Sequence, residues 1–482
     1  MKLNTVLRYV GIVLLINALF LFISSIISVL QGDEAFGPLI YSSLVAALFG
    51  IFPLLFVPPA KYISNIEGLI IVVSSWLLSC LVGTLPYILW GGEFTFTNAW
   101  FESVSGYTTT GSSILTDIEV LPSGLLFWRA ATHWLGGMGI IIFVLSVLPS
   151  MGIASMILCR LEMSPLAHEN FKYNAKMTLR ILLSVYVGLT FLETVSLLIC
   201  GMNLLDAVIH SFATIATGGF SSKNASIGYY NKIGIEVVIM IFMILAGIHF
   251  GLLFSAFIQK SKKLFKSEIV RYYFIALIFG IVLGALDLYG KQDLGWMDAL
   301  RISAFQIISI GTSTGFATAD TSVWPPVGQI LLIFFALQCA CAGSTSGGIK
   351  VDRIVLFAKA VYKQLKLLQH PRAIITLKMN GRSIDDEFLA MGILYLSVYL
   401  FIILLASILL IALGVDTLSA FSGTVATTGN VGPGLGTVGS VSNYSQIPAL
   451  GKWILTATML LGRLEVYGLI LFFLPTLWKD MM

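Results

Sequence analysis

The chain alternates long apolar runs with short polar connections, and the run lengths predict membrane-spanning helices. Two runs come first, at 5–30 and 37–57, and each is long enough to cross about 30 Å of hydrocarbon. Later runs come in pairs, at 67–90 with 122–148, 175–202 with 233–258, 269–289 with a run starting near 326, and 387–414 with 448–475. We therefore expect an all-α integral membrane protein in which two N-terminal helices precede four similar units.

A short motif of a hydroxyl residue, a spacer and a glycine lies between the two runs of every pair. Its four copies are Thr109-Thr110-Gly111, Thr217-Gly218-Gly219, Ser313-Thr314-Gly315 and Thr427-Thr428-Gly429, the last followed by Asn430. Repetition in a fixed order indicates internal symmetry. It divides the chain into two transmembrane helices (1–64) and four pseudo-symmetric pore repeats around one central pore (65–158, 159–265, 266–380 and 381–482).

An amide or carboxylate side chain precedes each motif at a nearly constant distance. Asn98, Asp206 and Asp416 lie thirteen residues before Gly111, Gly219 and Gly429, and Asp298 lies seventeen before Gly315. Asn and Asp are preferred helix N-caps. The spacing predicts four half-helices capped by these residues, with about one extra turn in the third repeat. A half-helix that ends at a loop points its negative dipole end there, which favours a cation.

Composition supports a membrane location and excludes several other classes. The chain is 57% hydrophobic and 11% charged, with a net charge of +4, against about 25% charge in soluble proteins. The basic residues gather at 160–180, 260–271 and 350–382, between repeats, so we expect these loops and both termini to be cytoplasmic. The small net charge gives no reason to expect a nucleic-acid partner. The five cysteines show no zinc-site spacing, and we expect no organic cofactor.

The four motifs have the composition of an ion filter. Backbone carbonyls can replace the water shell of a cation, and irregular backbone at membrane depth is tolerated where it lines a cavity. Glycine reaches backbone conformations that other residues avoid and puts no side chain into the passage. The alternative is that glycine and hydroxyl residues only let helices approach closely. Four copies at matching places favour the filter.

Two features near the filter motifs are unusual for a membrane helix. The small, polar stretch from Gln338 to Gly348 interrupts the second run of the third repeat, so it must be a loop inside the protein. Arg463 lies inside the last apolar run, and Glu465, two residues away, points to a different face. Arg463 therefore needs other oxygen partners, such as carbonyls of the loop or pore water. We expect it to face the pore as a barrier to cations; a structural salt bridge is the alternative.

On these motifs the chain resembles the Trk/Ktr/HKT superfamily of potassium transporters, and most of all its TrkH branch, over nearly its whole length. The resemblance implies potassium as the transported ion, one pore per chain, a homodimer in the lipid of a bacterial cytoplasmic (inner) membrane, and a cytosolic nucleotide-binding regulatory subunit of the TrkA type. It also implies a gate formed with Arg463 by an intramembrane loop within about 339–348, comprising Cys341, Ala342, Gly343, Ser344, Thr345, Ser346, Gly347 and Gly348.

Other functions remain as alternatives to a channel. In a coupled symporter for potassium with a proton or sodium, Glu102, Glu193 or His249 could carry a proton, although the sequence does not arrange them in a relay. An intramembrane enzyme would need a catalytic set, and the chain contains no HExxH or GxGD motif and no GxSxG elbow between a strand and a helix. We therefore expect that the protein is not an enzyme.

Overall fold

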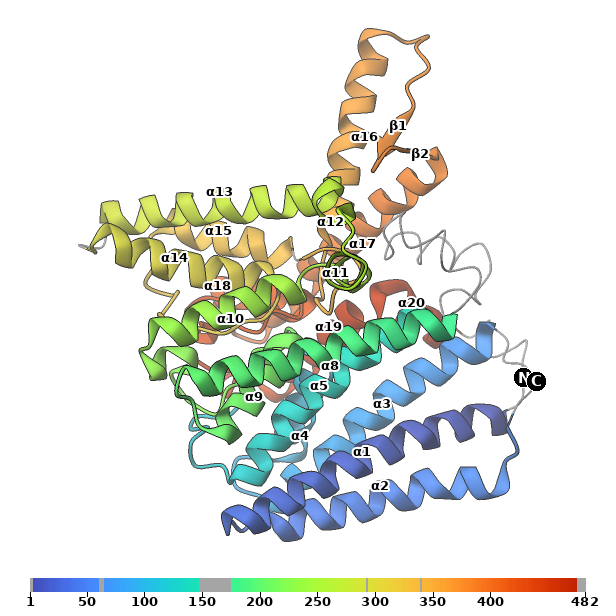
Figure 1. The fold of residues 1–482 in the computed structure, drawn as a ribbon, viewed down its shortest axis with the longest axis vertical. Coiled ribbons are helices and arrows are strands. Elements are labelled where there is room, and N and C mark those ends of the chain that lie inside the picture. The colour runs from blue at the N-terminus through green and yellow to red at the C-terminus, as the bar shows by residue number, and fades with distance from the viewer. Residues whose placement is uncertain (1–2, 60–64, 147–174, 292–293, 339, 475–482) are drawn as a thin grey trace.

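The computed structural model describes residues 3–59, 65–146, 175–291, 294–338 and 340–474. These ranges are predominantly helical, as predicted (Figure 1). The predicted boundary between the first two repeats, at 158–159, and Cys339, at the start of the predicted gate loop, lie outside the described residues.

The first half of the chain contains the two N-terminal helices and two of the repeats. Helix α1 (Leu3–Gln31) packs against α2 (Phe36–Phe56), α3 and α5. The first repeat contains α3 (Asn65–Trp90), the short α4 (Phe96–Tyr107) and α5 (Ser123–Ser146). The second contains α8 (Ala175–Ile199), the short α9 (Leu204–Ile215), the 3₁₀ helix η2 (Ser226–Tyr230), α10 (Ile233–Ala246) and α11 (Phe250–Phe257).

The second half repeats this order of long helix, short helix, loop and helix. After α12 (Lys263–Lys266), the third repeat contains α13 (Glu268–Lys291), the short α14 (Trp296–Gly311), α15 (Pro326–Leu337) and α16 (Val351–Gln369). Strands β1 (Leu377–Met379) and β2 (Arg382–Ile384) form an antiparallel pair. The fourth repeat contains α17 (Asp386–Ala412), the short α18 (Thr417–Thr428), η3 (Gly436–Val438), α19 (Ala449–Arg463) and α20 (Glu465–Phe473).

Several helices have the length and composition of membrane spans. In the described ranges six are long and apolar enough, and up to eight spans result if each of two bent pairs counts as one. The helix axis bends by 108° between α10 and α11, and by 115° between α19 and α20. The second helix of the third repeat is interrupted where the sequence predicts it, because α15 ends at Leu337 and α16 begins at Val351.

The distribution of buried residues fits a lipid environment. Only 28% of the α2 span is buried, against 61% of α3, which lies inside the bundle. Large apolar side chains such as Leu48 and Phe49 are exposed on α2. One buried polar group is paired within the bundle: Asn17 donates to Ser79 Oγ at 2.8 Å and accepts from the Tyr107 hydroxyl at 2.9 Å. Such internal pairing is what hydrocarbon requires of polar groups.

One part of the molecule projects from the helical bundle. Helix α16, the strand pair and the first turns of α17 extend beyond the other helices (Figure 1). Ion pairs hold the base of this projection, where Lys359 Nζ lies 2.6 Å from Glu268 Oε1 and Lys363 contacts Asp386. The projection includes most of the basic stretch 350–382, for which the sequence predicts a cytoplasmic location.

Candidate functional site

The short helix of each repeat ends at a glycine loop, and the helix start sets the position of that loop. The N-caps of α4, α9, α14 and α18 are Thr95, Asn203, Gly295 and Asp416. The Asp416 carboxylate accepts a hydrogen bond from Ser419 N at 2.9 Å, as predicted, whereas Gly295 caps α14 without a side-chain bond.

The other three predicted caps, Asn98, Asp206 and Asp298, are wrong, because each lies three residues beyond the actual cap. The backbone N–H groups of Asn98 and Asp206 instead donate to the side-chain oxygens of Thr95 and Asn203, at 3.4 and 2.8 Å. A cap side chain accepts from the third helical residue, so polar residues often occur three apart at a helix start. The spacing alone does not tell which of the two is the cap.

In the fourth loop, the glycine that matches the other three lies three residues later than predicted. Its matching glycine is Gly432, with φ of 101°, while Gly111, Gly219 and Gly315 have φ of 83°, 79° and 82°. Gly429 instead has φ of −75° and forms the C-cap of α18. Two positions before each matching glycine, the backbone is also left-handed, with φ of 52° to 56° at Thr109, Thr217, Ser313 and Asn430. The match of Thr427-Thr428-Gly429 to the other three motifs is therefore wrong.

Both corrections follow from one error in alignment. The predicted spacing compared the third helical residue of three repeats with the true cap of the fourth, which moved the fourth glycine by three positions. Counted from the observed caps, the glycine follows after sixteen residues in three repeats and after twenty in the third. The predicted extra turn is confirmed, because α14 has 16 residues and the other three short helices have 12.

The four glycine loops form a closed ring through close backbone contacts. A Cβ atom at Gly111 would lie 2.1 Å from Gly218 O, and one at Gly219 would lie 2.0 Å from Thr314 O. A Cβ atom at Gly315 would lie 2.0 Å from Val431 O, so the third loop meets the fourth. One at Gly432 would lie 2.6 Å from Thr110 O, so the fourth loop meets the first. Each loop therefore touches the next one around a common centre. Any side chain at these glycines would force two loops apart.

One cavity is lined by all four ring glycines, together with residues of the adjoining loops. Its lining is rich in hydroxyl groups, including those of Ser112, Ser221 and Ser440. Near it, the side chain of Asn224, in the loop after Gly219, donates to Asp117, in the loop after Gly111, at 2.7 Å. This hydrogen bond holds the pKa of the Asp117 carboxyl below its usual range, so the group is negative at neutral pH. The lining itself also includes the cations Arg129 and Lys223, so oxygens are what the cavity offers to a cation.

Two side-chain oxygens of the ring are buried without a hydrogen-bond partner among the described residues. They are Thr109 Oγ1 and Asn430 Oδ1, which occupy equivalent positions in the first and fourth loops. The amide of Asn430 is oriented by donating to Thr110 Oγ1 and Met459 O, each at 3.0 Å. Buried oxygens normally have partners, so these two atoms are exceptions among the described residues.

The inserted loop between α15 and α16 packs directly against this ring. Thr345 Oγ1 donates to Ile215 O at the end of α9 at 2.9 Å, and Gly347 N donates to Ser313 Oγ at 3.2 Å. A Cβ atom at Gly347 would lie 2.5 Å from Asn430 Oδ1. The loop therefore contacts the second, third and fourth repeats together. Figure 1 shows this region between α11, α18 and α19 near the middle of the bundle.

Arg463 is the last residue of α19, and its guanidinium group reaches the same loop. Nη1 donates to Thr345 O at 2.7 Å and Nη2 donates to Gly136 O on α5 at 3.2 Å. Its exposed fraction is 2%. Glu465 points elsewhere, as predicted, and lies 2.7 Å from Arg353. Carbonyl oxygens of the loop and of α5 thus supply the oxygen contacts that the sequence predicts for Arg463.

Sequence reasoning missed two cations that hold this region. Lys350 is buried and its Nζ donates to Ser346 O within the loop, and Arg353 forms the buried ion pair with Glu465. Both residues belong to a basic stretch, which the positive-inside rule alone explained. A better signal was available, because both lie within a few residues of the polar, glycine-rich segment that must be enclosed by protein.

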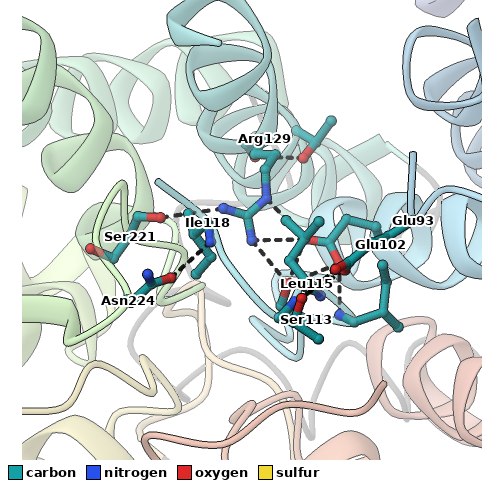
Figure 2. A network of polar contacts seen from close by, with 11 residues as sticks. Glu93, Glu102, Ser113, Leu115, Ile118, Arg129, Ser221 and Asn224 are labelled. Carbon is teal, nitrogen blue, oxygen red and sulfur yellow. Dashed lines mark hydrogen bonds and ion pairs between the residues drawn. The ribbon is translucent and has the colours of Figure 1, made fainter. Parts of the chain in front are cut away.

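A network of buried polar side chains contacts the loops that follow Gly111 and Gly219 (Figure 2). Arg129 Nη2 lies 2.7 Å from Glu102 Oε1, and both side chains are almost fully buried. Glu102 also accepts from Ile114 N at 3.1 Å, and Arg129 donates to Ser221 O at 3.3 Å. The Arg129 guanidinium lies 4.0 Å from the ring centroid of Phe220. The network therefore connects α4 and α5 to the loops that follow Gly111 and Gly219.

Comparisons with known proteins agree over the full length of the chain. The family of cation transport proteins called TrkH matches residues 60–482. The chain is 36% identical over 491 residues to the Trk system potassium uptake protein TrkH of Escherichia coli (strain K12), with 100% of both proteins covered. It is 34% identical to the protein of that name from Halomonas elongata, over 99% of this chain and 100% of the relative.

A solved structure is also similar in fold. The crystal structure of the potassium transporter TrkH from Vibrio parahaemolyticus matches with a TM-score of 0.90 at 32% sequence identity. The match covers 99% of this chain and 100% of that one.

Proposed function

This chain belongs to the TrkH family of cation transport proteins, and we propose that it carries potassium into the cell through the ring of glycine loops. The relatives are named as potassium uptake proteins, which supports potassium as the ion. The observation that carries the proposal is the closed set of contacts among Gly111, Gly219, Gly315 and Gly432. A passage enclosed by four backbone loops can surround one cation with oxygens.

The selectivity filter consists of the residues from the left-handed turn to the ring glycine in each repeat. These are Thr109, Thr110 and Gly111; Thr217, Gly218 and Gly219; Ser313, Thr314 and Gly315; and Asn430, Val431 and Gly432. The end of α18, which leads into the fourth loop, contains Thr427, Thr428 and the C-cap Gly429. With one glycine per loop in the ring, we expect fewer ordered carbonyl rings than in potassium channels, and hence weaker discrimination against sodium.

The intramembrane loop from Cys341 to Gly348 and Arg463 form the gate of this pathway. The loop lies against three of the four repeats, where it blocks the passage on the side away from the cavity. Arg463 adds a positive charge at the same level. A cation leaving the ring must pass both, so the loop is a steric barrier and Arg463 an electrostatic one.

The experiment that tests this function is potassium flux into liposomes that contain the purified protein. Gly219→Ala would place a Cβ atom 2.0 Å from Thr314 O and open the ring. We expect flux to fall at least about tenfold, because forced shifts in packed regions typically cost about 1–3 kcal/mol. Gly188→Ala on α8 is the matched control, since no atom lies within 4 Å of the added methyl group. Equal flux in the two variants would contradict the proposal.

Coupled symport is not favoured over a channel. Glu102, one of the three candidate proton carriers, is held by Arg129, and His249 accepts from Gly251 N as the N-cap of α11. A current whose reversal potential does not depend on pH, and depends on sodium only as one constant permeability ratio requires, would agree with the channel. A shift with pH, or a sodium dependence that no constant permeability ratio fits, would favour symport. Because the family is one of transport proteins, the prediction that the chain is not an enzyme is confirmed.

The protein is a membrane protein, and we place it in the bacterial cytoplasmic membrane with both termini inside the cell. The relatives are named as parts of a Trk system, which supports additional subunits. We propose a homodimer that binds a cytosolic nucleotide-binding subunit of the TrkA type. Mass measurement of the detergent-solubilised protein, alone and with that subunit, tests both parts. A monomer that does not bind the subunit would contradict them.

A further inference from the structure

A buried ion pair connects the helix after the intramembrane loop to the break in the last span. Arg353 Nη2 lies 2.7 Å from Glu465 Oε2, and the exposed fractions of the two side chains are 0% and 8%. The Arg353 guanidinium also lies 3.8 Å from the ring centroid of Tyr395 on α17. Three helices, α16, α17 and α20, therefore meet at one arginine. A buried pair of this kind fixes geometry, because either charge alone would be poorly solvated.

The carboxylate of this pair belongs to a residue with strained backbone geometry. Glu465 has φ of 51°, in the left-handed region that residues with a side chain rarely adopt. It follows the bend of 115° between α19 and α20, and Arg463 is the last residue before that bend. The direction in which Arg463 points therefore depends on the conformation of Leu464 and Glu465. Such strain persists only where surrounding contacts hold it.

Two side-chain links join the same two segments of the chain. Arg463 donates to Thr345 O in the loop, and Arg353, just after the loop, binds Glu465 just after Arg463. The first turn of α16 is itself fixed to the start of the loop, since Asp352 Oδ2 accepts from Ala342 N at 2.7 Å. Side-chain contacts thus link the loop to the bend, the bend to α16, and α16 back to the loop.

We propose that Arg353, Glu465 and Tyr395 are positioning residues that hold Arg463 against the intramembrane loop. The proposal rests on the role proposed above for the loop and Arg463, and assigns the residues that keep this barrier in place. With the pair intact, the bend keeps its strained form and Arg463 reaches Thr345 O. Without the carboxylate charge, the bend relaxes, Arg463 leaves its acceptor and the loop loosens.

The first test measures the loop itself, without any reference to transport. Cys341 is buried in the loop with an exposed fraction of 2%. In a chain whose other cysteines are replaced by serine, the labelling rate of Cys341 by a methanethiosulfonate reagent reports loosening. We expect Glu465→Gln to raise this rate about fivefold, the lower end of typical coupling between sites. Glu236→Gln, which removes the carboxylate facing Arg301 in another repeat, is the control. Equal rates in the two variants would overturn the proposal.

The second test is a double-mutant cycle on potassium conductance. Glu465→Gln should raise conductance about fivefold when Arg463 is present and cause no further rise in Arg463→Gln. An equal rise in both backgrounds would show that Glu465 acts independently of Arg463, and would overturn the proposal. If Arg463→Gln alone leaves conductance unchanged while Glu465→Gln still speeds Cys341 labelling, the barrier function fails and the positioning role stands.

A further variant keeps the proposal testable if Glu465→Gln does not fold. Tyr395→Leu leaves both charges in place and removes only the ring beneath the guanidinium. We expect a smaller rise in the labelling rate, of about twofold, as a cation–π contact is weaker than the ion pair. Size-exclusion profiles identify folded protein. A folded Tyr395→Leu variant that labels at the native rate would overturn the proposal.

Discussion

The glycine ring and the intramembrane loop below it differ in how they are held together. In the ring, backbone meets backbone, and a Cβ atom at any of the four glycines would lie 2.0 to 2.6 Å from a carbonyl oxygen of the next loop. The loop has two backbone hydrogen bonds to the break between α10 and α11, and it is also held by side-chain donors that bind single carbonyl groups, those of Lys350, Thr345 and Arg463.

The difference indicates which of these two layers, the glycine ring or the intramembrane loop, can move. Backbone contacts at such short range leave no alternative arrangement, so the ring is suited to fixed coordination of an ion. Single hydrogen bonds from long side chains can be exchanged for water or for another carbonyl at small cost. We therefore expect selectivity to depend on the ring and gating to depend on the loop, and mutations should separate the two layers.

The largest effect is expected at the buried ion pair between Glu102 and Arg129. Glu102→Gln would leave Arg129 buried without its ion-pair partner, and losing one partner of such a pair typically costs about 3–5 kcal/mol of stability. Thermal unfolding in detergent measures this loss. Glu119→Gln is the control, because its pair with Lys223 is partly exposed and 3.9 Å long. A similar small change in both variants would show that the ring does not need this support.

A smaller effect, of opposite sign for transport, is expected at the gate. Arg463→Gln removes the positive charge below the ring, and potassium conductance should rise about tenfold, equivalent to about 1.4 kcal/mol. Recordings in lipid bilayers measure the rise, with Arg301→Gln, a half-exposed arginine in the third repeat, as control. Unchanged conductance at every potassium concentration, with folded protein, would contradict the electrostatic barrier.

The next effect concerns the loop alone. Lys350→Met keeps the length of the side chain but loses the hydrogen bond to Ser346 O. A hydrogen bond is worth about 1 kcal/mol, so the open fraction should rise about fivefold. Single-channel recording gives this fraction together with the conductance of the open state. If the potassium-to-sodium permeability ratio changed as well, the loop and the ring would not be separate layers.

The smallest effect tests the corrected helix starts. Asp416→Ala removes a cap that accepts from Ser419 N, and should cost about 0.5 to 1 kcal/mol. Asp298→Ala should cost no more than a few tenths, because Gly295 is the cap of α14. Thermal unfolding of the two variants compares them directly. Equal losses would restore Asp298 as a cap and contradict the corrected alignment.

Much of the architecture could be predicted from the pattern of residues. Apolar runs of sufficient length must become helices in hydrocarbon, and the break before Val351 follows from a polar, glycine-rich stretch within such a run. The longer third half-helix followed from counting residues between a polar side chain and the glycine. Each of these depends on local sequence and on the solvent around it.

The alignment of the fourth repeat could not be obtained in this way. Gly429 and Gly432 both follow α18 closely, and both are compatible with a loop. Neither leaves room for a side chain, since a Cβ atom would lie 2.6 Å from Ala336 O at Gly429 and 2.6 Å from Thr110 O at Gly432. What distinguishes Gly432 is that its close neighbour is the first loop, more than three hundred residues away. Similarly, the partners of Arg129 and Arg353 depend on which helices pack together.

The sequence by itself therefore determined that the chain crosses a membrane and that Arg463 needs oxygen partners, and it predicted four similar units. These properties follow from the cost of exposing polar groups to hydrocarbon, which each segment meets separately. Only the tertiary structure decided which glycines close the ring, which carbonyl groups receive Arg463 and which carboxylate neutralises Arg353. Those choices depend on contacts of a few ångströms between distant segments, and no local pattern records them.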